Sequence, residues 1–236
     1  MAEWRFGRGW TEPELAERLV EAGWLGRNFD AAQSAMTRAN GWSHYYSESV
    51  VARERSGPPD PAGLFERARV ALIGYQFSDP AIVVGHFDGD ARLLGRRMLL
   101  ELKVVGLHYL CAVVVAAVRD DRAEGRTTFG YRYDTLEGHI ERGSEWFLLT
   151  KDEATGEIRF RVDASWRPGE FPNAWSRGGF GLLAPRYQER WHRSAHGRLF
   201  LLAHYGSLTP PRPGAGHLVH AGPDVVFESL PARRRS

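Results

Sequence analysis

Residues 145–167 read EWFLLTKDEATGEIRFRVDASWR, and this stretch decides the fold. From Ile158 to Arg167, apolar and polar side chains alternate without exception, and this period of two predicts a β-strand with one buried face. Residues 145–151 predict a second strand. The Glu-Ala-Thr-Gly turn at 153–156 joins the two strands into an antiparallel hairpin.

Further strands are predicted upstream of this hairpin. They cover residues 43–54, 81–87, 97–104, 107–119 and 127–136. In the strand over 97–104, Arg97, Glu101 and Lys103 alternate with apolar residues, so one face of this strand is expected in solvent.

Two helices are predicted around these strands. Asp60 is the expected cap of the first helix and Pro61 its first residue, and apolar residues recur at helical spacing as far as Ile73. The second helix covers about residues 179–204, where apolar residues recur at steps of three, four and seven. The chain is therefore predicted to be α+β, with a curved antiparallel sheet of about six to seven strands around a long C-terminal helix.

This order of elements resembles the START-like, or helix-grip, fold. Proteins with that fold commonly hold a hydrophobic ligand between the concave face of the sheet and the long helix. The resemblance implies a small hydrophobic molecule as the partner of this protein.

A more specific resemblance rests on residues 129–139, FGYRYDTLEGH, and on the acidic, glycine and aromatic positions that follow them. Together with FERAR at 65–69 and SWRP at 165–168, they are similar to the signature of the domain-of-unknown-function family numbered nineteen-ninety, over about residues 41–202. The usual family pattern has Gly and Pro where this chain has Asp134 and Glu137. The resemblance implies a START-like fold and no particular activity.

The two ends of the chain are expected to be extensions of one START-like domain over residues 41–206. Residues 1–40 include a predicted helix over about 12–22, because Thr11 and Glu14 have capping-box spacing. The aromatic residues of this segment indicate that it docks on the body; they are Trp4, Phe6, Trp10, Trp24 and Phe29. Residues 207–236 are predicted to be a Pro/Gly-rich linker and a tail, in which 217–230 could add one short strand.

The composition, with 43% hydrophobic and 25% charged residues, is typical of a soluble globular protein. The longest apolar run, residues 104–118, is too short for a membrane-spanning helix. The basic residues are almost all arginine, as in proteins from GC-rich, bacterial-type genomes, so no nucleic-acid partner is expected. The one cysteine, Cys111, is expected to be an inert core residue, and the absence of a signal-peptide pattern predicts a cytoplasmic protein.

The main candidates for ligand contacts lie in and around the signature segment. Tyr131, Tyr133 and Thr135 share one face of their strand, and Glu145 begins the next strand. A carboxylate on an apolar face must be paired or have a raised pKa, and His139 or an arginine is its expected partner. A hydrogen-bonded turn at 138–139 explains the same residues without any ligand, so both interpretations stay open.

Other candidates are weaker. His44 and Tyr46 open the first strand of the body and could line the cavity, and Trp166 is interpreted as core rather than as a platform for a ligand. His192 and His196 are four residues apart on the long helix, but they lie among arginines and lack the glutamate of the zinc-protease motif. They are interpreted as a solvated helix face, and neither a metal nor a cofactor is expected.

Two functions of different classes remain open. The first is a module that binds a small hydrophobic molecule under the long helix. The second is an enzyme of the cyclase or hydrolase type, in which Glu145 or His139 is a general base. A third possibility is that aromatic side chains fill the interior and the protein acts through surface contacts.

Overall fold

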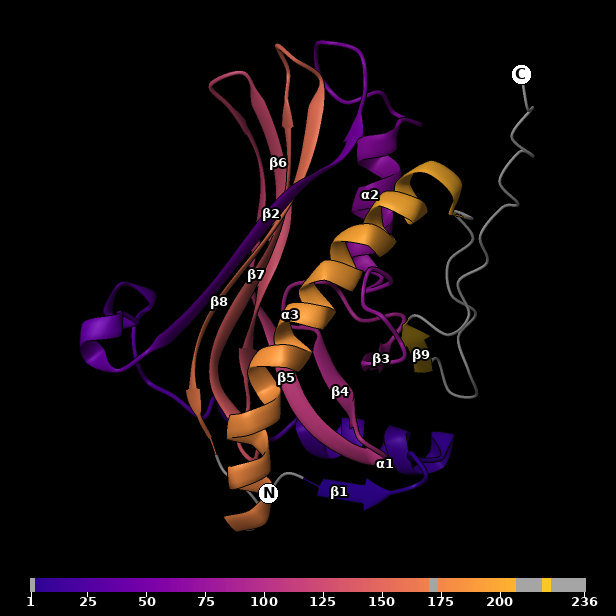
Figure 1. The fold of residues 1–236 in the computed structure, drawn as a ribbon. Helices are drawn as coiled ribbons and strands as arrows, with labels where there is room; N and C mark the ends of the chain where they lie inside the picture. The colour runs from indigo at the N-terminus through magenta and orange to yellow at the C-terminus, as the bar shows by residue number, and fades with distance from the viewer. Residues whose placement is uncertain (1–2, 170–173, 207–217, 222–236) are drawn as a thin grey trace, which may run out of the picture.

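The computed structural model describes residues 3–169, 174–206 and 218–221 of the chain. Within these ranges, one antiparallel sheet of nine strands curves around the long helix α3, Ala174–Tyr205, and the shorter helix α2, Leu64–Ile73, lies on the same side (Figure 1). The strand order is β2-β8-β7-β6-β5-β4-β3-β9, and β1 pairs with β5. The predicted α+β architecture is confirmed.

The strands are β1 Glu3–Phe6, β2 Ser43–Arg53, β3 Val83–Asp88, β4 Arg97–Val104, β5 Leu107–Ala123, β6 Arg126–Thr135, β7 Glu141–Asp152, β8 Glu157–Pro168 and β9 Leu218–Ala221. The number of strands exceeds the predicted six to seven because β1 and β9, four residues each, join the sheet from the two ends of the chain. The rest of the predicted linker and tail lies outside the described residues. The N-terminal segment also contains two short 3-10 turns, Gln33–Ala35 and Arg38–Asn40.

Helix α2 begins three residues later than the sequence predicted. Its first residue is Leu64, and Gly63 before it has extended backbone. The carboxylate of Glu54, which directly follows β2, accepts a hydrogen bond of 2.8 Å from the Phe65 N–H in the first turn. A side chain from another element therefore does the capping that was assigned to Asp60.

The prediction that one face of β4 is in solvent is wrong. Helix α1, Glu12–Ala22, covers that face, and its Leu15 packs in a second apolar cluster with Leu99 of β4 and Leu110 of β5. The predicted bounds of α1 are confirmed, and Glu14 accepts a hydrogen bond of 2.8 Å from the Thr11 N–H as the capping-box spacing indicated. Alternation of polar and apolar side chains shows that a strand has two different faces. It does not show whether another element covers the polar one.

The N-terminal segment is packed down only in part. Trp10 and Phe29 are buried, whereas Trp4, Phe6 and Trp24 are exposed. Of the five aromatic residues that led to the prediction of a docked segment, two therefore pack in the interior and three do not.

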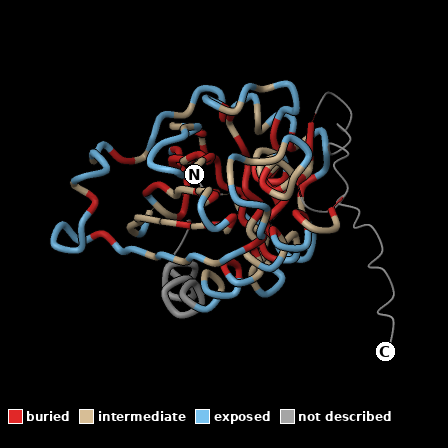
Figure 2. Tube along the Cα trace, turned by 90° about the horizontal axis from the view of Figure 1, so that it is seen from above, coloured by how far each residue is buried: buried red, intermediate tan, exposed pale blue. Residues whose placement is uncertain are grey.

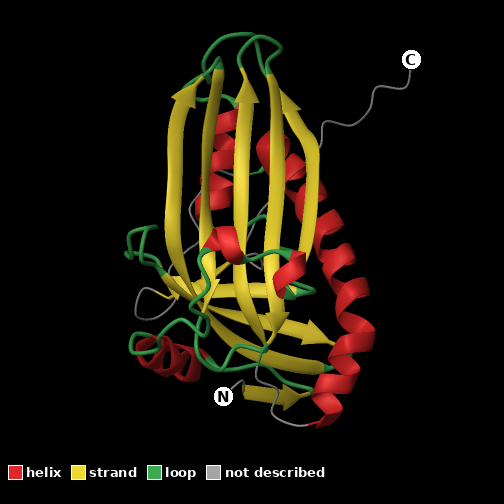
Figure 3. Cartoon of the chain, turned by 90° about the vertical axis from the view of Figure 1, so that its left-hand side faces the viewer, coloured by secondary structure: helices red, strands yellow, loops and turns green. Residues whose placement is uncertain are grey.

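The main core lies between the sheet and the two helices α2 and α3. Figure 3 looks onto the other side of the long strands, and these helices lie behind them. Figure 2 shows the buried segments gathered in the interior, where helices and sheet overlap. Among the residues that the structure describes, no helix combines the length and the apolar character needed to cross a membrane.

Candidate functional site

The register of four neighbouring strands aligns the inward side chains in rows across the concave face. One row consists of Tyr133 on β6, Glu145 on β7, Ala164 on β8 and Tyr45 on β2. The next row toward α2 begins with Tyr131 and Phe147 and continues with Val162 and Ser47. The strand period of two thus brings together residues that lie up to 119 positions apart in the chain.

Aromatic rings fill the half of the concave face that lies toward α2. The Phe77 ring centroid is 4.9 Å from that of Phe147 and 6.1 Å from that of Trp191 on α3. Phe147, Phe160 and Val162 have no exposed surface. This half of the interior has the close packing of an ordinary core.

The row that contains Glu145 is less completely covered. The Glu145 side chain keeps 12% of its surface exposed, although β7 lies between β6 and β8 in the sheet. Its neighbour Ala164 and the inward Tyr45 are also only half-buried. Because Glu145 is on the concave side of the sheet, we interpret this exposed surface as facing the space between the sheet and α3.

Two polar groups contact Glu145. The Tyr133 hydroxyl donates a short hydrogen bond to Oε2, and His192 Nε2 of α3 lies 3.7 Å from Oε1. Burial raises the pKa of Glu145 to about 8, although the hydrogen bond from Tyr133 acts in the opposite direction. A carboxyl group with this pKa is mostly protonated at neutral pH and can both donate and accept a proton.

The interpretation of His192 and His196 as a solvated helix face is wrong. The His192 side chain is only 3% exposed, and its ring lies 4.0 Å from the ring of Tyr45, centroid to centroid. Burial lowers the pKa of His192 to about 3, so its imidazole is neutral. The edge strand β2 covers this side of α3, and nothing in the helical spacing distinguishes a side covered by a strand from one in water.

A second carboxyl group lies on the same face of the same strand. Glu141 is four residues before Glu145, so the two side chains share a face of β7. It accepts a hydrogen bond of 3.1 Å from Gln188 Nε2. Burial raises the pKa of Glu141 to about 7. Helix residues 188 and 192 therefore face strand residues 141 and 145, four apart on each element.

His139 is not the partner of Glu145 that the sequence suggested. Its Nδ1 accepts a hydrogen bond of 2.9 Å from the Glu141 N–H, and burial lowers its pKa to about 4. The preceding Gly138 has a φ of 80°, so the turn uses both residues in the way that the ligand-free interpretation described. The histidine beside Glu145 comes from α3, 47 residues further along the chain.

The other predicted site residues separate into three groups. Tyr131 and Thr135 are buried structural groups: the Tyr131 hydroxyl donates to the Leu72 carbonyl at 3.1 Å, and Thr135 binds Asn28 and Gly143 through its hydroxyl. Trp166 is half-buried in the row next to Glu145. His44 and Tyr46 point to the outer face of β2, away from α3, and are exposed, so their predicted place in a cavity is wrong.

Sequence reasoning missed the inward residues of β2. Tyr45, Ser47 and Ser49 alternate with His44 and Tyr46, and the three of them lie against α3. The period of two correctly assigned these residues to two different faces of β2. Both faces carry polar side chains, however, so hydrophobicity gave no basis for deciding which face points inward.

Cys111 is buried, as predicted, and burial raises its pKa to about 12, so the thiol is inert. The described part of the chain contains no group of three or more His, Cys, Asp or Glu side chains that could hold a metal ion.

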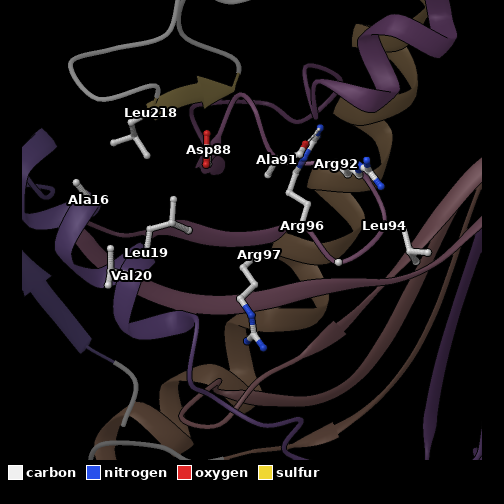
Figure 4. Close-up of a pocket in the computed structure, with 11 residues that line it drawn as sticks. Ala16, Leu19, Val20, Asp88, Ala91, Arg92, Leu94, Arg96, Arg97 and Leu218 are labelled. Carbon is white, nitrogen blue, oxygen red and sulfur yellow. Dashed lines mark hydrogen bonds between the residues drawn. The ribbon is translucent and has the colours of Figure 1, made fainter.

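A separate groove of about 480 Å³ lies on the outer side of the molecule. Figure 4 shows its lining side chains coming from α1 on one side and from the loop between β3 and β4 on the other. Two of its arginines are engaged by the backbone, since Arg96 donates to the Ile73 carbonyl and Arg97 to the Ala22 carbonyl. These arginines hold the loop and α1 in place, and none of the residues around Glu145 lines this groove.

Several solved structures are similar to this chain. A START superfamily protein from Mycobacterium smegmatis is 14% identical, with 67% of this chain and 96% of that chain covered and a TM-score of 0.39. The major latex-like protein 151 from Panax ginseng is 13% identical, with coverages of 67% and 95% and a TM-score of 0.36. A norcoclaurine synthase point mutant from Thalictrum, in complex with a transition-state analogue, is 12% identical, with coverages of 68% and 93% and a TM-score of 0.35.

None of the curated proteins matches the sequence. Residues 27–196 match the family described as a domain of unknown function, DUF1990, which is the family that the signature at 129–139 predicted. Because this match covers more than half of the chain, the protein belongs to the DUF1990 family.

Proposed function

We propose that the protein binds a small, largely apolar molecule between the sheet and α3, with the polar group of that molecule against Glu145. The observation that carries the proposal is the exposed surface of Glu145 in the middle of the concave face. In the next row of the sheet, by contrast, Phe147 and Val162 have no exposed surface. Space for a ligand is therefore expected beside Glu145 and not in the aromatic half of the interior.

The groups around this space favour a particular kind of ligand. The protonated Glu145 can donate a hydrogen bond, and the neutral His192 beside it has no charge to offer an anion. A second carboxyl group, Glu141, lies on the same face and disfavours negative charge. The expected ligand has an uncharged polar group, such as a carbonyl or hydroxyl, on an apolar body that packs on the aromatic half.

Native mass spectrometry of the protein purified from its own host tests this proposal. The expected result is a second mass above that of the chain, which disappears when the protein is denatured. A single mass corresponding to the chain alone, in material that was never exposed to detergent or denaturant, contradicts the proposal.

A variant that fills the space provides the matched comparison. Ala164→Phe places a ring beside Glu145 on the concave side, and Ser165→Phe adds the same ring to the next position, which points to the outer face. Ala164→Phe is expected to lose the bound molecule and Ser165→Phe to retain it. Retention of the molecule by a folded Ala164→Phe protein would contradict the proposed location.

A further inference from the structure

A hydrogen-bonded chain of polar side chains connects His192, which faces Glu145, with the edge strand of the sheet. His192 Nδ1 lies 3.1 Å from Ser47 Oγ, and the same oxygen lies 2.9 Å from His196 Nε2. His196 Nδ1 lies 2.8 Å from Ser49 Oγ. Since His192 Nε2 faces Glu145 at 3.7 Å, each imidazole uses its two nitrogens in two different contacts of the chain.

These contacts are all satisfied by neutral histidines when the hydrogen atoms point toward Glu145. In this arrangement, Ser49 donates to His196 Nδ1, His196 Nε2–H donates to Ser47, and Ser47 donates to His192 Nδ1. His192 Nε2–H then points to an ionised Glu145. The lowered pKa values of both histidines, which follow from their burial, agree with uncharged rings.

The opposite arrangement satisfies the same contacts equally well. A protonated Glu145 then points its hydrogen at His192 Nε2, His192 Nδ1–H donates to Ser47, Ser47 donates to His196 Nε2, and His196 Nδ1–H donates to Ser49. The two arrangements are interconverted when each group passes one proton to its neighbour. Water at Ser49 supplies or accepts the proton at the outer end of the chain, so both serines and both histidines are neutral before and after the transfer. The net result is one proton moved between water and the Glu145 carboxyl group.

We propose that Ser49, His196, Ser47 and His192 form a proton wire to Glu145, and that Glu145 performs acid–base chemistry on the bound molecule. This inference rests on the proposed function, because it assigns a reaction to the same site. In the acid step, the O–H bond of Glu145 breaks, a bond forms between that proton and a basic atom of the ligand, such as a carbonyl oxygen, and the electron pair stays on the carboxylate. The wire then restores the proton from water at Ser49, which is half-buried on the edge strand β2.

A ligand makes the wire necessary. In the free protein, the exposed surface of Glu145 gives its proton a direct route to water. A molecule that fills the space beside Ala164 closes that route, and the chain through His192 leads away from the ligand to the edge strand β2. Other ionisable groups that act on Glu145 are Tyr133, Glu141 and Asp163, and none of them extends the chain.

The test measures how fast the carboxyl proton of Glu145 exchanges with water, by NMR on ligand-free protein with carbon-13-labelled glutamate side chains. Ala164→Phe is the reference because its ring covers the exposed side of Glu145. Adding Ser47→Ala to this reference is expected to slow the exchange by about 10²-fold, the lower end of what a positioned proton-transfer group contributes. Adding Ser47→Thr, which keeps the hydroxyl group, is expected to leave the rate unchanged.

A second variant covers the case in which Ser47→Ala does not fold. His196→Phe keeps an aromatic ring against Phe160, whose centroid lies 5.1 Å from that of His196, and removes both nitrogens. It is expected to slow the exchange as much as Ser47→Ala. An unchanged rate in either folded variant would overturn the wire, since a merely structural hydrogen bond would change the melting temperature and not the exchange rate.

The two proposals fail independently. The exchange rates are measured without a ligand, so a chain without any bound molecule in native mass spectrometry overturns the proposed function and leaves the rates interpretable. Conversely, an unchanged rate overturns the wire and leaves ligand binding untouched.

Discussion

Glu145 is a carboxyl group whose surroundings favour its protonated form, because most of its surface is removed from water. Among the described side chains that contact it, no cation compensates for the lost hydration. The Tyr133 hydroxyl donates a hydrogen bond to it, and the neutral imidazole of His192 lies 3.7 Å away, so neither group brings a positive charge. At the scale of the residue, the site is thus prepared for an exchangeable proton rather than for a fixed ion pair.

This environment has a consequence for the pH dependence of stability. The raised pKa of Glu145, about 8 compared with 4.5 in the unfolded chain, means that the folded state holds a proton that the unfolded state has released between these values. The contribution of this group to stability is therefore full below about pH 4.5 and declines as the pH rises to 8. Glu145→Gln cannot ionise and therefore lacks this decline. Its free energy of unfolding is expected to rise relative to that of the wild type by a few kcal/mol between about pH 5 and pH 9.

Calorimetric melting of both proteins across this range checks the prediction. Glu48→Gln, on the outer face of β2, is the control and should follow the wild type at every pH. If the melting temperatures of the wild type and Glu145→Gln depended on pH in the same way, the carboxyl group would not be buried in the way described.

Two glycines illustrate how the surroundings determine the effect of one methyl group. A Cβ at Gly197 in α3 would meet nothing within 4 Å, so Gly197→Ala is expected to stabilise the protein by about 1 kcal/mol through helix propensity alone. A Cβ at Gly143 in β7 would lie 2.1 Å from the Ser165 carbonyl oxygen, which belongs to the backbone of β8. Gly143→Ala is expected to destabilise it by about 1–3 kcal/mol. Urea unfolding of both variants measures the two effects, and equal signs would contradict the account.

At the scale of elements, one buried ion pair joins β2, β7 and α2. Lys151 Nζ lies 2.6 Å from Glu54 Oε2, with 0% and 4% of the two side chains exposed, and the other oxygen of Glu54 accepts from the first turn of α2. The pair therefore ties the start of a helix to two strands that are neighbours of β8 and not of each other. This explains why α2 begins at Leu64.

Removal of one partner should be costly. Lys151→Ala leaves Glu54 buried without its cation and is expected to lower the free energy of unfolding by about 3–5 kcal/mol. Arg193→Ala, which removes an exposed pair with Glu189 on α3, is the control and is expected to cost less than about 1 kcal/mol. Denaturant unfolding compares the two, and a similar small loss in both would show that the buried pair contributes no more than a surface pair.

At the scale of the whole molecule, a second polar chain connects both ends of the polypeptide to the outer face of the sheet. Glu101 of β4 binds His108 of β5 at 2.6 Å and His86 of β3 at 3.4 Å. His86 in turn contacts His220 of β9 at 2.8 Å, and His220 contacts Glu12 of α1 at 3.2 Å. Five elements, among them the first helix and the last strand, meet through these side chains.

This chain should make the docking of the two ends sensitive to acid. Burial alone would raise the pKa of Glu101, but hydrogen bonds with His86 and His108 lower it to about 2. Its stabilising contribution is therefore present above about pH 4.5 and is lost as the pH falls toward 2. Glu101→Gln is expected to lower the melting temperature at neutral pH and to match the wild type near pH 2.

Hydrogen exchange at neutral pH locates the effect. Backbone amides of α1 and β9 should exchange faster in Glu101→Gln, and those of β7 and β8 should not change, because the chain does not reach them. Uniformly faster exchange would indicate a general loss of stability instead.

The sequence by itself determined the secondary structure of the body and the family. Strict alternation at 158–167, the turn at 153–156 and the capping box at Thr11 are local signals, since each depends on residues that are close in the chain. The signature at 129–139 identified the family because it depends only on the identity and spacing of residues. The assignment of Tyr133 and Glu145 to inward faces also followed from the period of two, and the register makes them direct neighbours.

Only the tertiary structure decided which groups meet at the site. The partner of Glu145 is His192 rather than His139, and the serines that contact the helix histidines are on the first strand of the body, about 145 residues before them. Such contacts depend on the strand order and on the rotation of α3 over the sheet. A period in the sequence states which side chains share a face, but not which element will cover that face, and here the covering element determines the chemistry of the site.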